Sequence, residues 1–215
     1  MNRLPGIHHH EMVTEPTPAP DGAISSPALD QLFREARTLR HWIPPSIPLE
    51  LLKEIYDLAR LGPTSSNCCP ARFLFLVTSE AKERLVPALS PGNVDKTRTA
   101  PVTVVIAWDS LFYEKFPFLT SGREAPDAWA ANPERAHETA FRNGSLQGAY
   151  FILAARAMGL DCGPMSGFNA KKVNAEFFPD GRWRANFLCN LGYGDRTKLF
   201  PRQPRLPFED ACQLL

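Results

Sequence analysis

The chain has 215 residues, of which 44% are hydrophobic and 22% charged, and its formal net charge at pH 7 is +1. This length fits one domain with enough apolar material for a packed core, and the near-zero charge gives no general attraction to nucleic acid or anionic membranes. No apolar run approaches the roughly 20 residues of a spanning helix, and the N-terminus lacks an apolar signal core, so we expect a cytoplasmic protein.

The first 25 residues contain four prolines and little apolar material. We expect residues 1–25 to form a disordered, proline-rich leader in front of one domain, residues 26–215. The run His8–His10 could bind a metal weakly, but it is more typical of a floppy tail or a tag remnant. We expect no metal site.

Two helices are predicted next. Ser26–Pro27 gives the first one a hydroxyl cap followed by proline in the first turn, and this helix ends near residues 37–42. The second begins at Ser46 or Pro48, carries an apolar stripe at helical spacing, and ends at Gly62.

A polar segment, GPTSSNCCPARF, follows over residues 62–73. It places four short polar side chains in a row between two prolines, which supplies hydrogen-bond donors and acceptors but no strong base. Taken alone, the pattern is more typical of a helix cap and turn than of a binding loop. The functional alternative is a loop that binds the edge of a polar ring in a ligand.

Strands are predicted over Phe73–Val77 and Val102–Trp108, with a polar helix at 79–89 between them. Both strands are apolar on both faces, which predicts a sheet covered by helices on each side. Residues 109–135 are aromatic and irregular, as lids and binding loops often are.

The longest helical pattern runs from about Ala136 to Met158 and contains several small residues that let a backbone or a ring come close. A turn rich in glycine and proline is predicted at Cys162–Phe168, and a third strand at Phe187–Leu191. The tail that follows is basic at first and has little helical or strand pattern.

Conventional catalytic motifs are absent from the sequence: it contains no P-loop, no G-x-G-x-x-G and no G-x-S-x-G elbow. His137–Glu138 could be half of an acid–base pair, but an exposed helix start is the better interpretation. Cys68–Cys69 could hold a reactive thiol, but this needs a neighbouring cation, and a buried small hydrophobe is the better interpretation.

What remains is a set of arginines, hydroxyls, amides and a lysine just outside the apolar elements. Arginine and hydroxyl together suit a phosphate monoester, while Asn and Lys suit the carbonyls of a ring. Taken singly, each of these cations is more often a solvated surface charge.

The order of these anchors resembles the FMN-dependent nitroreductase superfamily over about residues 26–215. The family's phosphate motif R-S-x-R-x-[FY] is matched by RTLRHW at 37–42, and its loop P-S-S-x-N-x-Q-P-W by PTSSNCCPA at 63–71. Its N-x-x-K followed by A-P is matched by NVDK and AP within residues 93–101. Its G-F is matched at 167–168 and its late R-L at 205–206.

Three positions depart from that pattern. Cys69 stands where the family has Gln, Ala71 where it has Trp, and Ser166 where it has Glu. With the segments KTRTAPVTVVIAWDS and GPMSGF, these changes resemble the branch that contains the malonic semialdehyde reductase of the pyrimidine-utilisation (Rut) pathway.

The resemblance implies a nitroreductase-like α+β sandwich, with a mainly antiparallel central sheet wrapped by helices, in an intertwined homodimer. It implies FMN at the dimer interface, NADH or NADPH as electron donor, and ping-pong hydride transfer to a small-molecule acceptor. The acceptor it favours is malonic semialdehyde, reduced to 3-hydroxypropionate. The alternatives are a broad nitroarene or quinone reductase and a flavin-binding protein without turnover.

It also implies that the flavin carries the chemistry and that no protein group acts as a catalytic base, with Lys96 supporting the reduced ring. The implied cofactor-binding residues are Arg37, Thr38, Arg40, Pro63, Thr64, Ser65, Asn67, Asn93, Lys96, Ser166, Gly167, Arg202 and Arg205. The loop at 63–67 is expected to come from the partner subunit. For the carboxylate of the substrate, the candidates from the residues are Arg142, Arg72 and Arg123.

Overall fold

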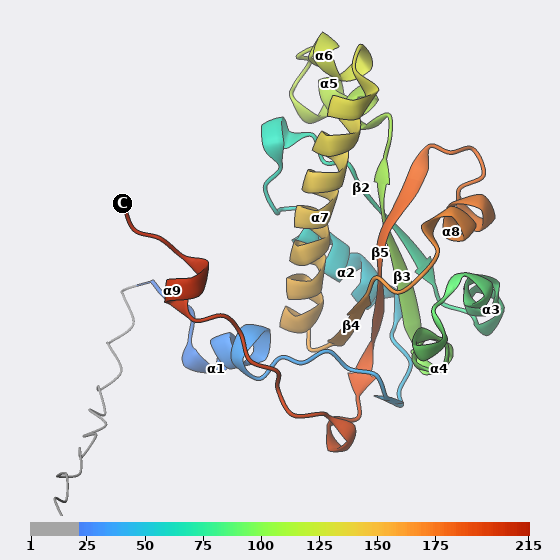
Figure 1. Ribbon diagram of the computed structural model, residues 1–215, viewed down its shortest axis with the longest axis vertical. Helices are drawn as coiled ribbons and strands as arrows, with labels where there is room; N and C mark the ends of the chain where they lie inside the picture. Colours follow the sequence, from blue (N-terminus) through green and yellow to red (C-terminus); the bar gives the residue numbers. More distant parts are fainter. Residues whose placement is uncertain (1–21) are drawn as a thin grey trace, which may run out of the picture.

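One antiparallel sheet lies at the centre of the computed structural model, which describes residues 22–215 (Figure 1). Strand β3 pairs with β2 on one side and with β5 on the other, and the free edge of β5 pairs with β4 and, at its end, with β1. The strands are β1 (Trp42–Ile43), β2 (Ala71–Leu76), β3 (Val102–Asp109), β4 (Asp161–Met165) and β5 (Trp183–Gly194). The expected mainly antiparallel sheet is confirmed.

The helices are α1 (Ser26–Leu29), α2 (Leu49–Ala59), α3 (Ser79–Leu85), α4 (Pro91–Thr99), α5 (Phe116–Leu119), α6 (Asp127–Ala130), α7 (Pro133–Ala157), α8 (Ala170–Phe177) and α9 (Phe208–Ala211). Helices α2 and α7 cover one face of this sheet, and α3 and α8 cover the other. A π-helical turn, Asp30–Arg34, continues α1, and short 3₁₀ turns occur between other elements, including Ser65–Asn67. Residues 1–21 of the expected leader, with its histidine run, lie outside the described part. Within residues 22–215, no helix is both long and apolar enough to cross a bilayer.

Strand β3 shows why the molecule has two helical layers. All eight of its residues are buried, and successive side chains point to opposite faces. Val104 and Ile106 pack in one cluster with α2 and α7, while Val105 and Ala107 pack in another with α3 and α8. The predicted sheet with helices on both faces is therefore confirmed.

Helix α7 forms the spine of the first layer, as its long helical pattern predicts. Asn132 caps it by accepting a hydrogen bond from the Arg135 backbone N–H, and Pro133 occupies the first turn. Beyond its last turn, Gly159 adopts a left-handed φ of +83°. A Cβ added to Gly148 would lie 2.6 Å from the Phe187 ring, so glycine is what lets α7 approach the sheet.

The structure departs from the predicted elements mainly where the sequence has no regular pattern. The turn expected at 162–168 is strand β4 in its first part, paired with β5 from Asp161↔Gly192 to Met165↔Leu188. The polar residues 91–99, for which the sequence predicts no element, form helix α4. The excursion at 109–135 contains α5 and α6, and Phe112, Phe116 and Trp129 of this segment form an aromatic cluster.

Candidate functional site

A cleft of about 790 Å³ lies between residues 36–41 and the tail at 195–205. This volume is within the range of small-molecule sites. Six lysines and arginines line it, against one carboxylate, that of Asp195. The cations are Arg37, Arg40, Arg156, Lys198, Arg202 and Arg205. We call it the cation cleft.

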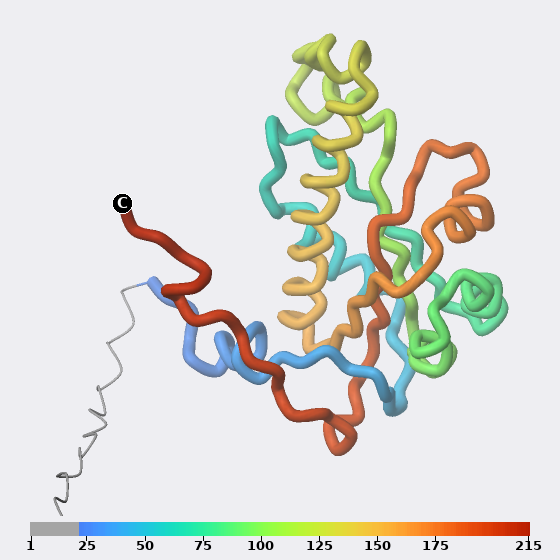
Figure 2. The backbone as a smooth tube through the Cα atoms, viewed as in Figure 1, coloured from blue at the N-terminus to red at the C-terminus, as the bar shows by residue number. Residues whose placement is uncertain are grey.

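Hydrogen bonds to backbone carbonyls hold the two walls of the cation cleft in place. The Leu39 N–H donates to the Cys162 carbonyl (3.0 Å), which fixes the first wall against β4, and the Asp195 N–H donates to the His41 carbonyl (2.9 Å). Arg202 of the tail donates to the carbonyls of Arg34 (2.5 Å) and Ala36 (2.9 Å). The tail therefore runs beside the segment that leads from α1 to β1 (Figure 2).

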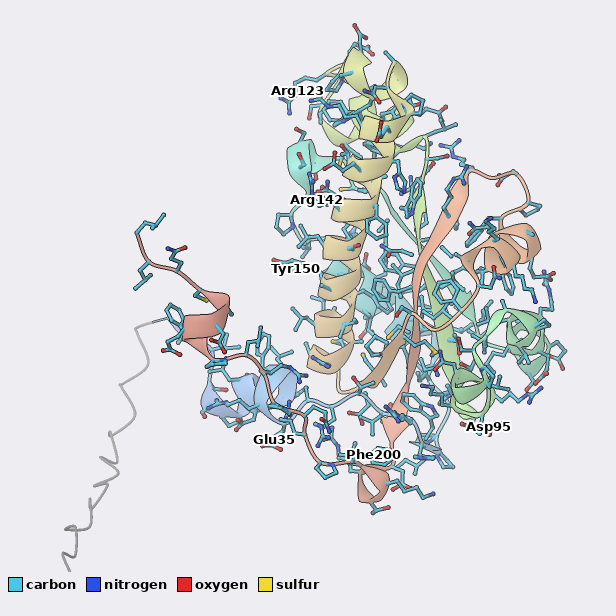
Figure 3. The ribbon with its side chains drawn as sticks, in the orientation of Figure 1. Glu35, Asp95, Arg123, Arg142, Tyr150 and Phe200 are labelled. Carbon is cyan, nitrogen blue, oxygen red and sulfur yellow. The ribbon has the colours of Figure 1, made fainter. Side chains whose placement is uncertain are left out.

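Two arginines of the predicted phosphate motif contact Phe200 of the tail, a residue that Figure 3 labels. The Arg37 guanidinium donates to the Phe200 carbonyl, and the Arg40 guanidinium carbon lies 5.3 Å from the centroid of the Phe200 ring. Within residues 22–215, neither arginine pairs with a carboxylate. Their charges are thus left for an anion that enters the cleft.

Lys96 lies on α4, close to Arg40. Its carbonyl accepts hydrogen bonds from Trp42 Nε1 and Asn190 Nδ2, both at 3.0 Å, which anchors this turn of α4 to β1 and β5. Burial and, to a lesser degree, the positive charge of Arg40 lower the pKa of the Lys96 ammonium. The two cations therefore repel each other without a negative group between them.

The predicted residues Asn93 and Gly167 are in direct contact. Asn93 Nδ2 donates to the Gly167 carbonyl at 2.7 Å, and the Ser90 N–H donates to the same oxygen at 2.9 Å. A Cβ on Gly167 would lie 2.7 Å from Asn93 Nδ2, so only glycine fits there without a shift. The fold thus brings the Ser166–Gly167 turn against α4.

Arg156, in the last turn of α7, is a cleft residue that the motifs do not identify. Its Nη1 donates to the Leu32 carbonyl at 3.1 Å. Its Nε is the one buried side-chain nitrogen or oxygen within residues 22–215 that has no hydrogen-bond partner. An unsatisfied buried N–H costs about 1–3 kcal/mol, and the guanidinium of Arg156 adds a positive charge to the lining of the cleft. In the sequence, Arg156 looks like an ordinary cation at a helix C-terminus.

The polar loop at 63–67 lies elsewhere, beside the N-terminal half of α7. The Ser65 N–H donates to Asn143 Oδ1, and Asn67 Nδ2 donates to the Leu119 carbonyl, both at 2.8 Å. The cation cleft lies at the other end of α7, where Arg156 is located (Figure 1). One chain therefore does not bring the loop and the cleft together.

Two cysteines follow this loop. Cys68 is buried, and burial raises the pKa of its thiol to about 11, so the thiol stays protonated at neutral pH. Cys69 has a left-handed φ of +39°, and its thiol lies 3.4 Å from Asn67 Oδ1, to which it donates.

The three arginines considered for a substrate carboxylate have different surroundings. Arg72 pairs at 2.8 Å with Asp109, whose side chain is only 2% exposed, so its charge is already used inside the fold. Arg142 pairs with Glu138 one turn earlier on α7 and is 72% exposed. Arg123 is exposed in the segment between α5 and α6, and Figure 3 shows it at the same end of the molecule as Arg142.

No group of three or more His, Cys, Asp and Glu residues is placed to hold a metal ion in the part of the chain that the structure describes.

Comparisons with known proteins agree with this fold. Residues 33–193 match the "Nitroreductase family". Proteins named "Putative NADH dehydrogenase/NAD(P)H nitroreductase" are 54% identical over 187 residues in Ralstonia nicotianae (87% of this chain, 96% of the relative) and 55% identical over 193 residues in Stenotrophomonas maltophilia (89% and 98%).

Among solved structures, the fold is similar to that of a "putative nitroreductase in complex with FMN" from Exiguobacterium sibiricum. The two chains are 19% identical, with a TM-score of 0.75 over 86% of this chain and 96% of that one. A nitroreductase-like structure from Bacillus subtilis gives a TM-score of 0.76 at 20% identity, over 87% and 98% of the two chains. From the matched region and the close relatives, we conclude that this chain belongs to the nitroreductase family.

Proposed function

We propose that the chain is an FMN-dependent NAD(P)H oxidoreductase. The observation that carries this proposal is the cation cleft, which sets six lysines and arginines against one carboxylate. A phosphate monoester carries a charge near −2 at neutral pH and suits such a cleft. Two further findings support FMN as the cofactor. The chain belongs to the nitroreductase family, and a solved structure with a similar fold is described as a complex with FMN.

In this proposal, the two sides of the site hold different parts of FMN. The phosphate would be bound by Arg37, Thr38, Arg40, Arg202 and Arg205. The ring would lie toward Asn93, Lys96, Ser166 and Gly167. When bound, FMN supplies the redox chemistry between NADH or NADPH and an electron acceptor. The ammonium of Lys96 would offset negative charge on the ring side.

We also propose that the working unit is a homodimer. In one chain, the loop that carries Pro63, Thr64, Ser65 and Asn67 is separated from the cation cleft by the C-terminal half of α7. A second copy can supply this loop to the cleft. Exposed apolar side chains on and after α2 and on α7 support a covered surface there. They include Tyr56, Leu58, Leu61, Phe141, Leu146 and Tyr150, which are 37–76% exposed.

The acceptor we propose is malonic semialdehyde. Cys69 and Ala71, in place of Gln and Trp, remove bulk next to the loop that would meet the flavin. A small aldehyde acid needs a cation for its carboxylate, and Arg142 lies on α7 near that loop. The exposed Arg142–Glu138 pair contributes only a few tenths of a kcal/mol, so a substrate carboxylate can replace Glu138.

The test is steady-state oxidation of NADH and NADPH with malonic semialdehyde, the uncharged aldehyde propanal, a nitroarene and a quinone. We expect kcat/KM for malonic semialdehyde to exceed that for propanal by about tenfold or more, because a charge-assisted pair in the transition state contributes about 1.5–3 kcal/mol. Arg142→Gln should erase this difference and leave quinone reduction intact. Arg84→Gln, which removes a similarly exposed arginine on α3, is the matched control.

Two outcomes would replace the proposed acceptor. Equal efficiency on both aldehydes, or brisk nitroarene reduction without aldehyde turnover, would favour a broad nitroarene or quinone reductase, which the names of the relatives also suggest. Flavin binding with no oxidation of NADH or NADPH by any acceptor would favour a binding protein without turnover.

A further inference from the structure

A second cleft, of about 440 Å³, lies at the opposite end of α7 from the cation cleft. The end of β3, the start of β5, the segment between β3 and α7, and the first turn of α7 form its walls. They include Trp108, Tyr113, Trp129, His137 and Arg184. We call it the aromatic cleft. None of the residues assigned to FMN or to the acceptor lines it, so a ligand in this cleft does not depend on the proposed function.

The aromatic walls are already formed. Trp108 and Trp129 are each 6% exposed, so they present an edge or a face while their rings stay packed. Trp129 is held edge-on by Phe112 and Phe116, with ring centroids 5.0 and 5.3 Å away. A ligand would therefore meet a rigid aromatic wall and would not have to order it.

A positively charged side chain, Arg184, lies beside these rings. The Arg184 guanidinium carbon lies 6.0 Å from the centroid of the Trp108 ring, and the His137 ring contacts the same indole edge-on at 4.9 Å. In the part of the chain that the structure describes, no carboxylate lies within salt-bridge distance of Arg184.

Two acidic residues of this part of the sequence, Asp109 and Glu114, are engaged by other arginines. Asp109 pairs with Arg72 at 2.8 Å and with Arg182 at 3.1 Å, and Glu114 pairs with Arg182 at 2.9 Å. Because these carboxylates are already neutralised, Arg184 keeps its charge for a group that comes from outside.

We propose that the aromatic cleft binds a flat aromatic ligand that carries a carboxylate. Its volume suits a ligand of one or two rings. A flat ring packs on the indoles in the offset or edge-on geometry that aromatic pairs prefer, and a carboxylate pairs with the guanidinium of Arg184. An aliphatic acid would leave the indoles without a partner, and a neutral ring would leave Arg184 without one.

The test uses the full-length protein as purified and calorimetric titration with 2-naphthoate, with the neutral 2-naphthalenemethanol as the matched ligand. We expect one naphthoate site per chain, with tighter binding than for the alcohol. Arg184→Gln should weaken naphthoate binding about tenfold or more and leave binding of the alcohol unchanged, because only the acid loses a charge-assisted hydrogen bond. Arg135→Gln is the charge control, since Arg135 is an exposed residue of the same first turn of α7 that does not line the cleft.

A second variant fills the cleft and keeps Arg184. Ala130→Trp, at an exposed position of the cleft wall, should abolish binding of both ligands while the protein keeps its secondary structure by circular dichroism. The proposal is overturned if naphthoate does not bind, if neither variant weakens it, or if Arg135→Gln weakens it as much as Arg184→Gln. A change in the visible absorption of bound flavin on naphthoate binding would place the ligand at the flavin and would also overturn it.

Discussion

The arginines of the cation cleft are held by partners that an anion can replace. Arg37 donates to a backbone carbonyl of the exposed residue Phe200, and Arg40 lies over its ring. A phosphate would give these guanidinium groups charge-assisted hydrogen bonds, which are about twice as strong as neutral ones. The side chains therefore stand near their proposed ligand position without being neutralised by the fold.

Removal of one of these positive charges should lower the amount of FMN that the purified protein carries. We expect Arg37→Ala to fold normally and to bind FMN about tenfold to a hundredfold more weakly, because one charge-assisted contact of about 1.5–3 kcal/mol is lost. The measurement is the flavin-to-protein absorbance ratio after purification, followed by titration of the apoprotein with FMN. Arg98→Ala, which removes an exposed arginine of α4 paired with Glu83, is the control. Full occupancy of Arg37→Ala at low FMN would remove Arg37 from the proposed site.

The sequence identified most of the cationic residues but not all of them. Arg37, Arg40, Arg202 and Arg205 stand out because they fall in motifs outside the apolar elements, and the structure places all four on one cleft. Arg156 does not stand out, because a cation in the last turn of a helix is common for reasons unrelated to binding. Only the three-dimensional structure shows its unsatisfied Nε.

At the scale of the elements, the contact between α7 and the sheet depends on Gly148. We expect Gly148→Ala to lower the free energy of unfolding by about 1–2 kcal/mol, because overpacking against Phe187 and Ile106 outweighs the better helix propensity of alanine. The measurement is urea unfolding. Gly92→Ala is the matched control: Gly92 is also helical, but a Cβ there meets nothing within 4 Å, so it should stabilise slightly. Equal effects of both changes would show that α7 tolerates the extra methyl group.

Elements with a strong apolar period could be predicted from the sequence, and elements without one could not. Helix α7 and the strands β2 and β3 have such a period. Strand β4 contains Gly163 and Pro164, which hide its pattern, and it exists because its backbone pairs with β5. Helix α4 is polar throughout much of its length, and its helical state depends on packing beside α3 and the Gly167 turn, which no local pattern reveals.

At the scale of the whole molecule, we expect a stable dimer. Sedimentation velocity at micromolar concentration should give a species of twice the 24.0 kDa chain mass that carries flavin and activity. Leu61→Arg, at a side chain that is 76% exposed near the end of α2, should shift the protein toward monomer and lower its flavin content. Val77→Arg, an exposed position between β2 and α3, is the control. An active, flavin-loaded monomer would contradict the proposal.

The whole-molecule arrangement could be predicted only through the family resemblance. Apolar patterns indicate a sheet between two helical layers, but the strand order and the pairing of β5 with β1, β3 and β4 depend on long-range contacts. The separation of the loop at 63–67 from the cation cleft is likewise invisible in a linear sequence, where both simply appear as polar segments.

This separation along α7 has a genetic consequence. In a dimer whose sites each combine the cleft of one chain with the loop of the other, a damaged cleft and a damaged loop in different chains fall into the same site. The other site of that mixed dimer is intact. Two alleles that are each inactive alone would therefore complement each other, restoring about a quarter of all sites when the chains mix at random in equal amounts. Two alleles that both damage the cleft would not.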